Sequence, residues 1–338
     1  MADALFWMDG YQASDAVESY DTLEPLSRTL DESEFWAVVG SYEGNWQVVR
    51  FARVESRQHL APDANPIVKK ELKWESTFTR NQYKSYVDEV RDEIRKGWVY
   101  QVNACRLLES ESQIDLRRLF QEIQLGHPAP ASAYFKNDRF EIASASPETF
   151  FRVDSSSNVR SITASPIKGT SRDGKFEEKD SAENVMIVDL MRNDISPLCE
   201  LGSVTVPRLL GVEEHPGLFH LVSDVRGNLK ASVTFEEILT RLSPAGSITG
   251  APKSSAREVI SRFEPYRGIY CGTIGWIHGG RAHFSVAIRT FFKDFLRAPK
   301  KTYFGTGAGI TWRSDAEGEW NETELKAERL MKVASGTV

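Results

Sequence analysis

The chain has 338 residues, of which 41% are hydrophobic and 27% charged, a composition typical of a globular protein with a large core. Its net charge of -6 argues against nucleic acid as the main partner, but a local cationic cluster could still bind a small anion. We find no apolar run of 18 residues and no basic-then-apolar N-terminal segment, so we expect neither a membrane span nor a signal peptide. The three cysteines are far apart in sequence, and we therefore expect reduced thiols and a cytoplasmic protein.

The N-terminal part of the chain predicts strands without recognisable chemistry. Residues 1–75 form a β-rich subregion, in which β-branched and aromatic residues predict strands at 36–40 and 45–54. A helix is predicted from about residue 79, because four apolar side chains recur on one of its faces: Tyr83, Val87, Val90 and Ile94. Gly97 is placed to end this helix.

Strands again occur in adjacent runs along the rest of the chain. Strands are predicted at 98–108 and 301–312, and the segment 269–292 predicts a hairpin that turns at Gly279 and Gly280. The run SSSN at 155–158 predicts a turn between strands. Four further helices are predicted, at 177–195, 234–242, 254–263 and 317–333. Because the strands come in hairpins rather than in strict alternation with helices, we expect an α+β fold with large antiparallel sheets.

One lysine stands in a segment suited to chemistry. In SPIKGTSRDG, residues 165–174, Pro166 and Gly169 frame Lys168 on a stiff stretch of backbone. The lysine could act as a nucleophile if burial or a neighbouring cation lowered its pKa. From these residues alone, a surface lysine in a turn is the more common interpretation.

Three glutamates are candidate ligands of a hard cation. Glu183 lies on the apolar face of the helix predicted at 177–195, where a carboxylate is costly to bury unless a cation meets it. Glu319 and Glu322 are neighbours on one face of the last predicted helix. Converging carboxylates would suit Mg²⁺. For Glu322, the alternative is a solvated ion pair with Lys326, four residues further on.

The segment SPAGSITGAPKS, residues 243–254, looks like a phosphate-binding loop but lacks the required spacing. Ala251 and Pro252 separate Gly250 from Lys253, so the sequence is not a nucleotide-binding Walker motif. A glycine-rich loop that enters a helix can still offer backbone N–H groups to a carboxylate, although a plain connection between helices is an alternative. The remaining candidates are weak one by one: Glu148, His220, Tyr270, Arg289 and the glycines of GTGAG at 305–309.

Taken together and in order, these segments resemble the chorismate-utilising enzymes, which include anthranilate, aminodeoxychorismate, isochorismate and salicylate synthases. The resemblance covers roughly residues 79 to 333, and its segments are GWVYQVN, ASPETF, PIKGT, AENVMIVDLMRNDI, FHLVSDV, GSITGAPK, YCGTIGW, FSVAIRT, GTGAGI and SDAEGEWNETELKA. It implies two large, mostly antiparallel sheets stacked face to face, with flanking helices and an active site between the sheets. Residues 76–338 would then be the chorismate-binding catalytic domain, and residues 1–75 a part of the same fold.

The resemblance also implies roles for individual residues. Mg²⁺ would be held by Glu183, Glu319 and Glu322 and would bind the ring carboxylate of chorismate. The same carboxylate would meet Thr249, Gly250 and Ala251. The enolpyruvyl carboxylate would be bound by Tyr270, Arg289, Gly307 and Gly309. Lys168 would attack the substrate, Glu148 would act as general acid and base, and His220 would lie near the reacting ring.

The PIKGT segment is similar to that of the aminodeoxychorismate synthases, whereas anthranilate synthases typically have alanine in place of Lys168. This implies amination of chorismate at C4 by ammonia, in the synthesis of a folate precursor. No glutaminase triad is recognisable, so we expect ammonia to come from a separate glutamine amidotransferase subunit or from solution. Anthranilate synthase component I and isochorismate or salicylate synthase remain the alternatives, and a catalytically silent binding protein is a third. Two features depart from the family pattern: Ser243 and Ala245 replace Phe and Gly, and a longer segment separates Glu148 from Lys168.

Overall fold

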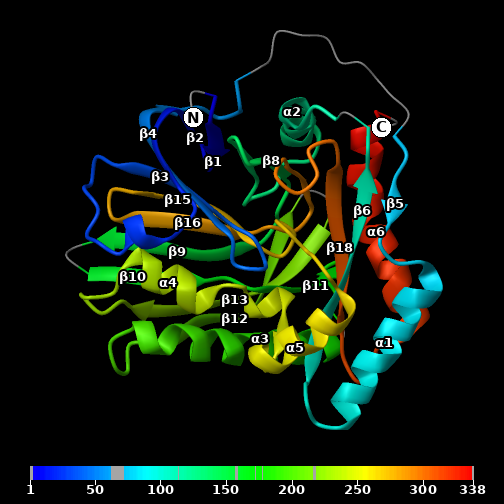
Figure 1. Ribbon diagram of the computed structural model, residues 1–338. Coiled ribbons are helices and arrows are strands. Elements are labelled where there is room, and N and C mark those ends of the chain that lie inside the picture. The colour runs from blue at the N-terminus through cyan, green and yellow to red at the C-terminus, as the bar shows by residue number, and fades with distance from the viewer. Residues whose placement is uncertain are drawn as a thin grey trace.

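Antiparallel pairing between strands organises this protein, which Figure 1 shows as a computed structural model. The structure describes residues 3–336 except 62–71, 113, 157–158, 172, 177 and 216–217. Within these residues, 18 strands are joined in one ladder of pairings. The ladder has two halves, whose strands run in different directions in Figure 1.

Each half of the ladder contains strands from distant parts of the chain. The first half consists, in order of pairing, of β12 (Thr205–His215), β13 (Leu218–Asn228) with β11 (Ile167–Ser171), β10 (Val159–Ala164), β9 (Thr149–Ser156), β16 (Arg281–Val286), β15 (Thr273–His278), β3 (Phe35–Gly40) and β4 (Trp46–Ser56). The second half consists of β1 (Leu5–Met8), β7 (Ala133–Lys136), β8 (Phe140–Ser144), β17 (Thr290–Asp294), β18 (Thr302–Ile310) and β6 (Gln101–Ser110), with the short strands β5 (Glu75–Ser76) and β14 (Gly250–Ala251) on β6.

Strand β2 (Tyr11–Tyr20) joins the two halves, because it pairs with β4 on one side and with β1 on the other. Its register with β4 shifts between Ala16 and Glu18, and such an irregularity bends a strand. The α+β class predicted from the hairpin pattern is confirmed. The two stacked sheets that the resemblance implies correspond to the two halves of this one curled ladder.

Alternation along the strands decides which side chains enter the main core. In β7, Phe135 belongs to the core that contains side chains of both halves, whereas Tyr134 belongs to a smaller cluster. Phe292 and Phe291 of β17 divide in the same way. Helices α2 (Leu116–Gly126) and α6 (Ala316–Ser335) contribute to the smaller cluster, so they cover the outer face of the second half.

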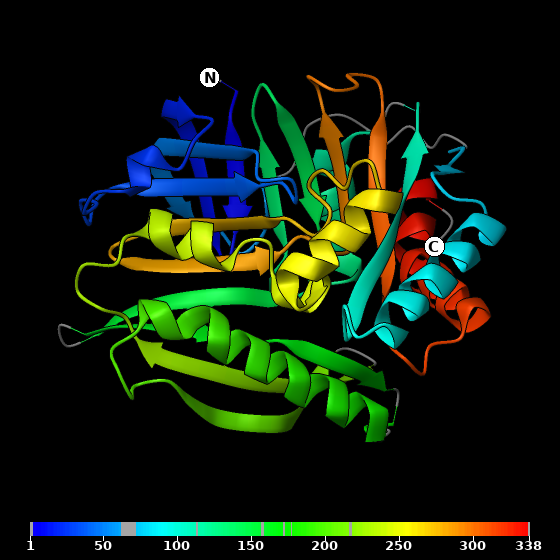
Figure 2. The same ribbon diagram turned by 60° about the horizontal axis from the view of Figure 1, so that its bottom comes forward.

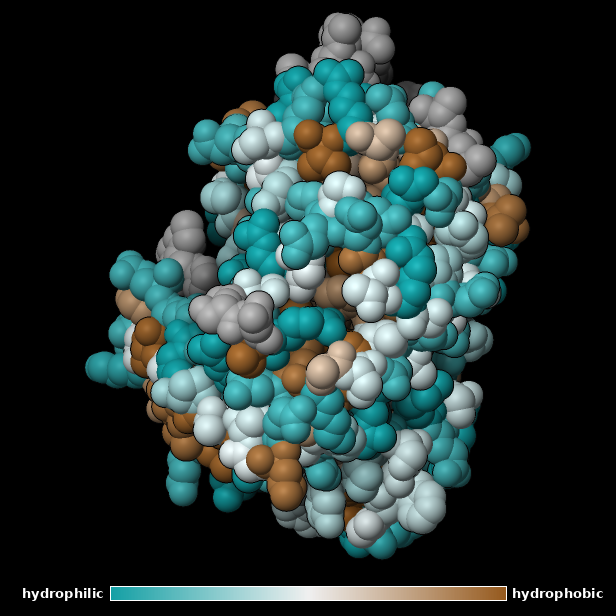
Figure 3. All heavy atoms as spheres, turned by 90° about the vertical axis from the view of Figure 1, so that its left-hand side faces the viewer, coloured by the Kyte–Doolittle hydropathy of each residue, from teal (hydrophilic) through white to brown (hydrophobic). Residues whose placement is uncertain are grey.

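The other helices contribute buried side chains to the main core. They are α1 (Arg80–Arg95), α3 (Glu178–Ile195), α4 (Phe235–Leu242) and α5 (Lys253–Phe263), and the short 3₁₀ helices are η1 (Glu24–Leu26), η2 (Ser196–Leu198) and η3 (Gly246–Ile248). Figure 2 shows α3 lying along β12 and β13, with which it is in contact. On the face seen in Figure 3, hydrophobic residues form small separate groups among hydrophilic ones. None of the helices in the described residues has the length and apolarity needed to cross a bilayer.

Most of the predicted elements are present in the structure. Thr79 caps α1 and forms a capping box with Gln82, and the other four predicted helices correspond to α3, α4, α5 and α6. The hairpin β15–β16 turns at Gly279 and Gly280, which have φ angles of 57° and 69°. The hairpin predicted over 269–292 was too long at its C-terminal end. Residues after 289 form a separate strand, β17, which pairs with β8 and β18. Helix α2 was not predicted from the sequence, and part of the turn predicted at 155–158 lies outside the described residues.

A close contact between β18 and the segment before β15 is a feature that only glycine permits. An added Cβ on Gly305 would lie 1.9 Å from Cγ of the buried Tyr270 ring. We expect Gly305→Ala to lower the free energy of unfolding by about 1–3 kcal/mol, because the ring or the strand must move. Urea unfolding measures this loss. Gly309→Ala is the matched control, since its Cβ would meet only the flexible end of Gln101. Equal losses in the two variants would contradict this account of the packing.

Candidate active site

Strand β11 carries Lys168 at a bulge. The register between β11 and β13 shifts between Lys168 and Thr170, and Gly169 between them has a φ angle of 78°. Glycine adopts this conformation readily, whereas other residues do so at a cost. An added Cβ on Gly169 would also lie 3.0 Å from the Cβ of Asp180 at the start of α3. The sequence PIKG therefore places Lys168 at an irregular point of a strand rather than in a surface turn.

Ser247 in η3 joins Lys168 to Glu148. The Nζ atom of Lys168 donates a hydrogen bond to the Ser247 carbonyl oxygen at 3.1 Å. The Ser247 hydroxyl donates a hydrogen bond to Oε1 of Glu148 at 2.7 Å. Glu148 immediately precedes β9 and is buried. One residue of a short helix thus connects two candidate catalytic groups, one on β11 and the other directly before β9.

Burial opposes the charge on both candidate groups. It raises the pKa of Glu148 above its usual value, although the Ser247 hydrogen bond and the charge of Lys168 act in the opposite direction. Burial also lowers the pKa of Lys168, although the negative charges of Glu148 and Glu183 act in the opposite direction. A nucleophile requires a neutral amine, which a lowered pKa favours. A general acid requires a carboxyl group that holds a proton, which a raised pKa favours.

The three candidate metal ligands lie on two helices. Glu183 on α3 is half-buried and its Oε1 atom is enclosed by protein. On α6, Glu319 is buried, whereas Glu322 is exposed and forms an ion pair with Lys326 at 2.6 Å. Both Glu183 and Glu322 act on the pKa of Lys168, so they lie within electrostatic range of it.

These carboxylates fit a hard cation by chemistry but do not form a ready-made cage. In the described part of the chain, no group of three His, Cys, Asp or Glu side chains is placed to hold a metal ion. Mg²⁺ prefers oxygen ligands and usually keeps several waters, so it needs only one or two protein carboxylates. Glu322 would have to give up its contact with Lys326 to become a ligand.

The loop after η3 presents backbone rather than side-chain groups. The Thr249 hydroxyl donates its hydrogen to the carbonyl oxygen of Ala245 at 2.8 Å, so it is already used as a donor. Gly250 and Ala251 form β14, which pairs with β6. Gly250 has a φ angle of 138°, and an added Cβ would lie 2.2 Å from the carbonyl oxygen of Gln101. Glycine is therefore required where this loop approaches β6.

Arg289 is the candidate cation for an anionic ligand. It is half-buried and has a φ angle of 54°, and burial lowers the pKa of its guanidinium. Over the described ranges, no protein group forms an ion pair or hydrogen bond with this guanidinium. Tyr270 lies within electrostatic range of it. A partly desolvated arginine with no such partner is suited to binding a carboxylate.

Two glycines of β18, which were candidates for binding the substrate, pack closely against β6. An added Cβ on Gly307 would lie 2.7 Å from the carbonyl oxygen of Ala104 on β6. Gly309 pairs with Asn103, which also lies on β6.

His220, the last candidate residue, is buried on β13 and pairs with Thr170 next to the bulge of β11. The fold therefore brings His220 close to the strand that carries Lys168.

Two further residues, Lys326 and Ser247, contact the candidate site but were not predicted to act in it. Lys326 donates a hydrogen bond from Nζ to the carbonyl oxygen of Gly307 at 3.0 Å, and its charge acts on both Lys168 and Glu148. In the sequence, the spacing of four residues between Glu322 and Lys326 indicated only a solvated ion pair. Ser247 lies inside a segment that was recognised, yet nothing in the sequence indicates that it contacts both Lys168 and Glu148.

Comparisons with known proteins agree on one family. The sequence profile described as "chorismate binding enzyme" matches residues 43–332. Anthranilate synthase component 1 of Saccharolobus solfataricus is 36% identical over 280 residues, which are 78% of this chain and 64% of that protein. Aminodeoxychorismate synthase component 1 of Escherichia coli is 36% identical over 274 residues, which are 77% of this chain and 59% of that protein. The chain thus spans less than two thirds of the length of these relatives.

Solved structures share the fold at lower identity. Anthranilate synthase component I from Streptococcus pneumoniae superposes with a TM-score of 0.78 at 22% identity. The match covers 97% of this chain and 89% of the S. pneumoniae chain. MenF, the menaquinone-specific isochorismate synthase from Escherichia coli, has a TM-score of 0.78 at 15% identity, with coverages of 98% and 88%. At these identities the likeness shows the fold alone.

The raised pKa of Glu148 makes a prediction about stability. The folded protein binds the proton of the Glu148 carboxyl group more tightly than the unfolded chain does. The free energy of unfolding therefore falls as the pH rises from 4.5, the usual pKa, towards the raised pKa of Glu148 in the folded protein. We expect Glu148→Gln to raise the free energy of unfolding at pH 8 and to have a smaller effect at pH 4. A tenfold change in proton affinity corresponds to about 1.4 kcal/mol.

Urea unfolding at the two pH values measures this difference. Glu32→Gln serves as the control, because Glu32 is exposed in the loop before β3. A gain in Glu148→Gln that is the same at pH 4 and pH 8 would show that desolvation of the carboxylate is not its cause.

Proposed function

The chain belongs to the chorismate-binding enzyme family, and we propose that it converts chorismate and ammonia into 4-amino-4-deoxychorismate, as aminodeoxychorismate synthases do. Anthranilate synthase and aminodeoxychorismate synthase relatives are equally similar in sequence, so overall similarity does not choose between the two activities. The choice rests on Lys168, a buried amine with a lowered pKa that is linked through Ser247 to Glu148.

In the proposed reaction, Lys168 acts as a covalent nucleophile. Its neutral amine attacks C2 of chorismate, the two conjugated ring double bonds shift, and the C4 hydroxyl leaves as water after taking a proton from Glu148. Ammonia then attacks C4, the two double bonds shift back, and the lysine amine is expelled. Glu148 takes a proton from the incoming ammonia. Burial supports both roles, because it favours the neutral forms of the amine and of the carboxyl group.

The two carboxylates of chorismate need separate positive partners. We propose that Arg289 binds the enolpyruvyl carboxylate together with Tyr270 and the backbone at Gly307 and Gly309. For the ring carboxylate we propose the backbone of residues 249–251 and Mg²⁺ held by Glu183, Glu319 and Glu322. The cation would supply charge neutralisation and orientation of the substrate. His220 on β13 would lie near the ring.

We propose that a glutamine amidotransferase supplies the ammonia. The relatives are named as component 1, which indicates a second component in those enzymes. The sequence of this chain contains no recognisable glutaminase triad. Ammonia as the attacking group also separates this proposal from isochorismate synthase, in which water attacks. Assays of the isolated chain should therefore contain an ammonium salt.

The covalent role of Lys168 can be tested by product analysis. We expect Lys168→Ala to lose on the order of 10³-fold or more of its amination rate, since a covalent nucleophile is removed. Binding of chorismate should be retained, because the carboxylate contacts do not involve the lysine. Liquid chromatography of the product and a coupled assay for pyruvate measure the outcome. The control is Lys175→Ala, since Lys175 is exposed.

Wild-type enzyme should release no pyruvate, because the product keeps its enolpyruvyl group. Release of pyruvate together with fluorescent anthranilate would instead identify an anthranilate synthase, despite the lysine. An early quench of the wild-type reaction, followed by mass spectrometry, should show an adduct on Lys168.

The metal site can be tested by binding as well as by activity. We expect Glu183→Gln to weaken Mg²⁺ binding at least about tenfold in isothermal titration calorimetry with chorismate present, because a carboxylate ligand is lost. The control is Glu328→Gln, which removes an exposed carboxylate from α6. Full activity of the wild type in excess EDTA would refute the proposed role of the metal.

A further inference from the structure

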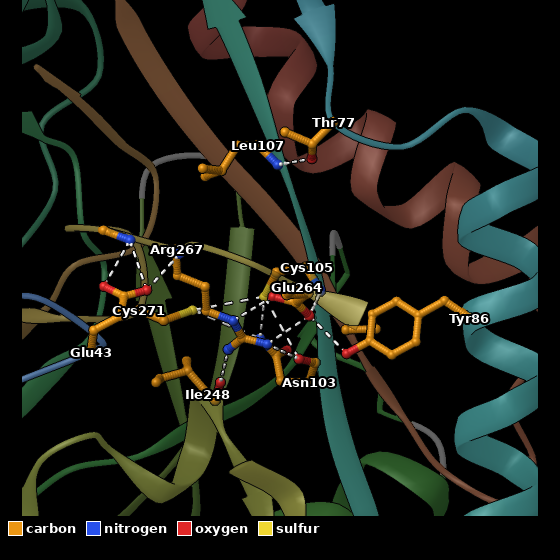
Figure 4. A network of polar contacts seen from close by, with 12 residues as sticks. Glu43, Thr77, Tyr86, Asn103, Cys105, Leu107, Ile248, Glu264, Arg267 and Cys271 are labelled. Carbon is orange, nitrogen blue, oxygen red and sulfur yellow. Dashed lines mark hydrogen bonds and ion pairs between the residues drawn. The ribbon is translucent and has the colours of Figure 1, made fainter. Parts of the chain in front are cut away.

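Arg267 makes a set of contacts that the proposed reaction does not use. It lies between α5 and β15 and is only 1% exposed. Its guanidinium forms an ion pair with Glu264, in which Nε donates to Oε2 at 2.6 Å and Nη2 donates to Oε1 at 2.9 Å. Figure 4 shows this pair at the centre of a network of polar contacts. A fully buried ion pair adds little stability compared with apolar side chains, so its presence calls for another reason.

The remaining donors of Arg267 contact two backbone segments of the candidate site. Nη1 donates to the carbonyl oxygen of Ile248 at 3.2 Å, and Nη2 donates to that of Asn103 at 2.6 Å. Ile248 is the last residue of η3 and directly follows Ser247. Asn103 lies on β6, and its N–H group donates to the carbonyl oxygen of Thr249 at 3.0 Å. The guanidinium therefore ties η3 to β6, next to the residues that contact Lys168 and Glu148.

The guanidinium is itself held in place from several sides. Oε1 of Glu264 accepts hydrogen bonds from the Tyr86 hydroxyl at 2.8 Å and from the Cys105 N–H group at 2.9 Å (Figure 4). The Arg267 N–H group donates to Oε1 of Glu43 at 2.7 Å. Contacts from α1 and β6 thus hold Glu264, the ion-pair partner of the guanidinium, and the turn before β4 holds the backbone of Arg267.

We propose that Arg267 is a positioning residue, which holds η3 so that Ser247 presents its carbonyl oxygen to Lys168 and its hydroxyl to Glu148. This inference rests on the function proposed above. A lysine at this position would keep the charge beside Glu264, but a single ammonium cannot reproduce the planar fork that reaches two carbonyl oxygens. An ordinary structural ion pair would affect stability alone, whereas a positioning residue affects the turnover of the folded enzyme.

The test compares two ion pairs that are both buried. Arg267→Lys keeps a counter-charge for Glu264, and Arg267→Met with Glu264→Gln removes both charges, so at least one variant should fold. The control is Lys293→Met with Glu141→Gln, which removes the buried pair between β17 and β8, joined at 2.7 Å. Urea unfolding measures stability, and steady-state assays with chorismate and ammonium measure kcat and KM.

We expect both Arg267 variants to lose about 10²-fold in kcat with little change in KM, since a displacement of about 1 Å can have this effect. The control should keep its kcat at a comparable loss of stability. Unchanged kcat in a folded Arg267 variant would overturn the proposal.

A second measurement does not depend on the reaction. Competitive acylation of lysines, followed by mass spectrometry across a pH range, reports the proton affinity of Lys168. In the Arg267 variants the profile of Lys168 should move from that of the wild type, while the control should leave it unchanged. An unmoved profile would overturn the positioning role. Failure of the proposed function would appear instead as a different product of the wild-type enzyme.

Discussion

The three residues of η3 must fit into a confined space between α3 and the strands, and the candidate site depends on that fit. An added Cβ on Gly246 would lie 2.3 Å from Cδ2 of Leu190 on α3, so only glycine lets the segment come this close. Ser247 then reaches both Lys168 and Glu148, while the carbonyl oxygen of Ile248 faces Arg267. A small displacement of η3 would therefore change the surroundings of both candidate catalytic groups together.

Burial shifts the pKa values of these two groups in the directions that the proposed reaction requires, and it is also costly. The same desolvation that lowers the pKa of Lys168 and raises that of Glu148 disfavours their charged forms in the folded protein. The two side chains are linked through Ser247, which accepts from Lys168 and donates to Glu148, so this cost is only partly offset. Active sites commonly sacrifice some stability in this way. The continuous core elsewhere in the ladder supplies the stability that tolerates it.

The curled ladder explains how one scaffold can serve several reactions. Helix α6 and strands β11, β14 and β18 each contribute candidate residues, and they come from both halves of the ladder and from its outer layer. Anthranilate synthase and isochorismate synthase structures share this fold at low identity. Function in such a fold depends on a few side chains in the site, and here Lys168 is the side chain on which the proposal depends.

Patterns over short stretches predicted much of this protein. Helical spacing predicted α1 and α3–α6, paired glycines predicted the β15–β16 turn, and ordered segments predicted the family and most candidate residues. The joining of the two halves through β2 and the contacts of Ser247, Lys326 and Arg267 could not be predicted. Ser247 is 79 residues from Lys168 and 99 from Glu148. Contacts over such separations leave no periodic pattern in a sequence, because they form only when packing brings distant segments together.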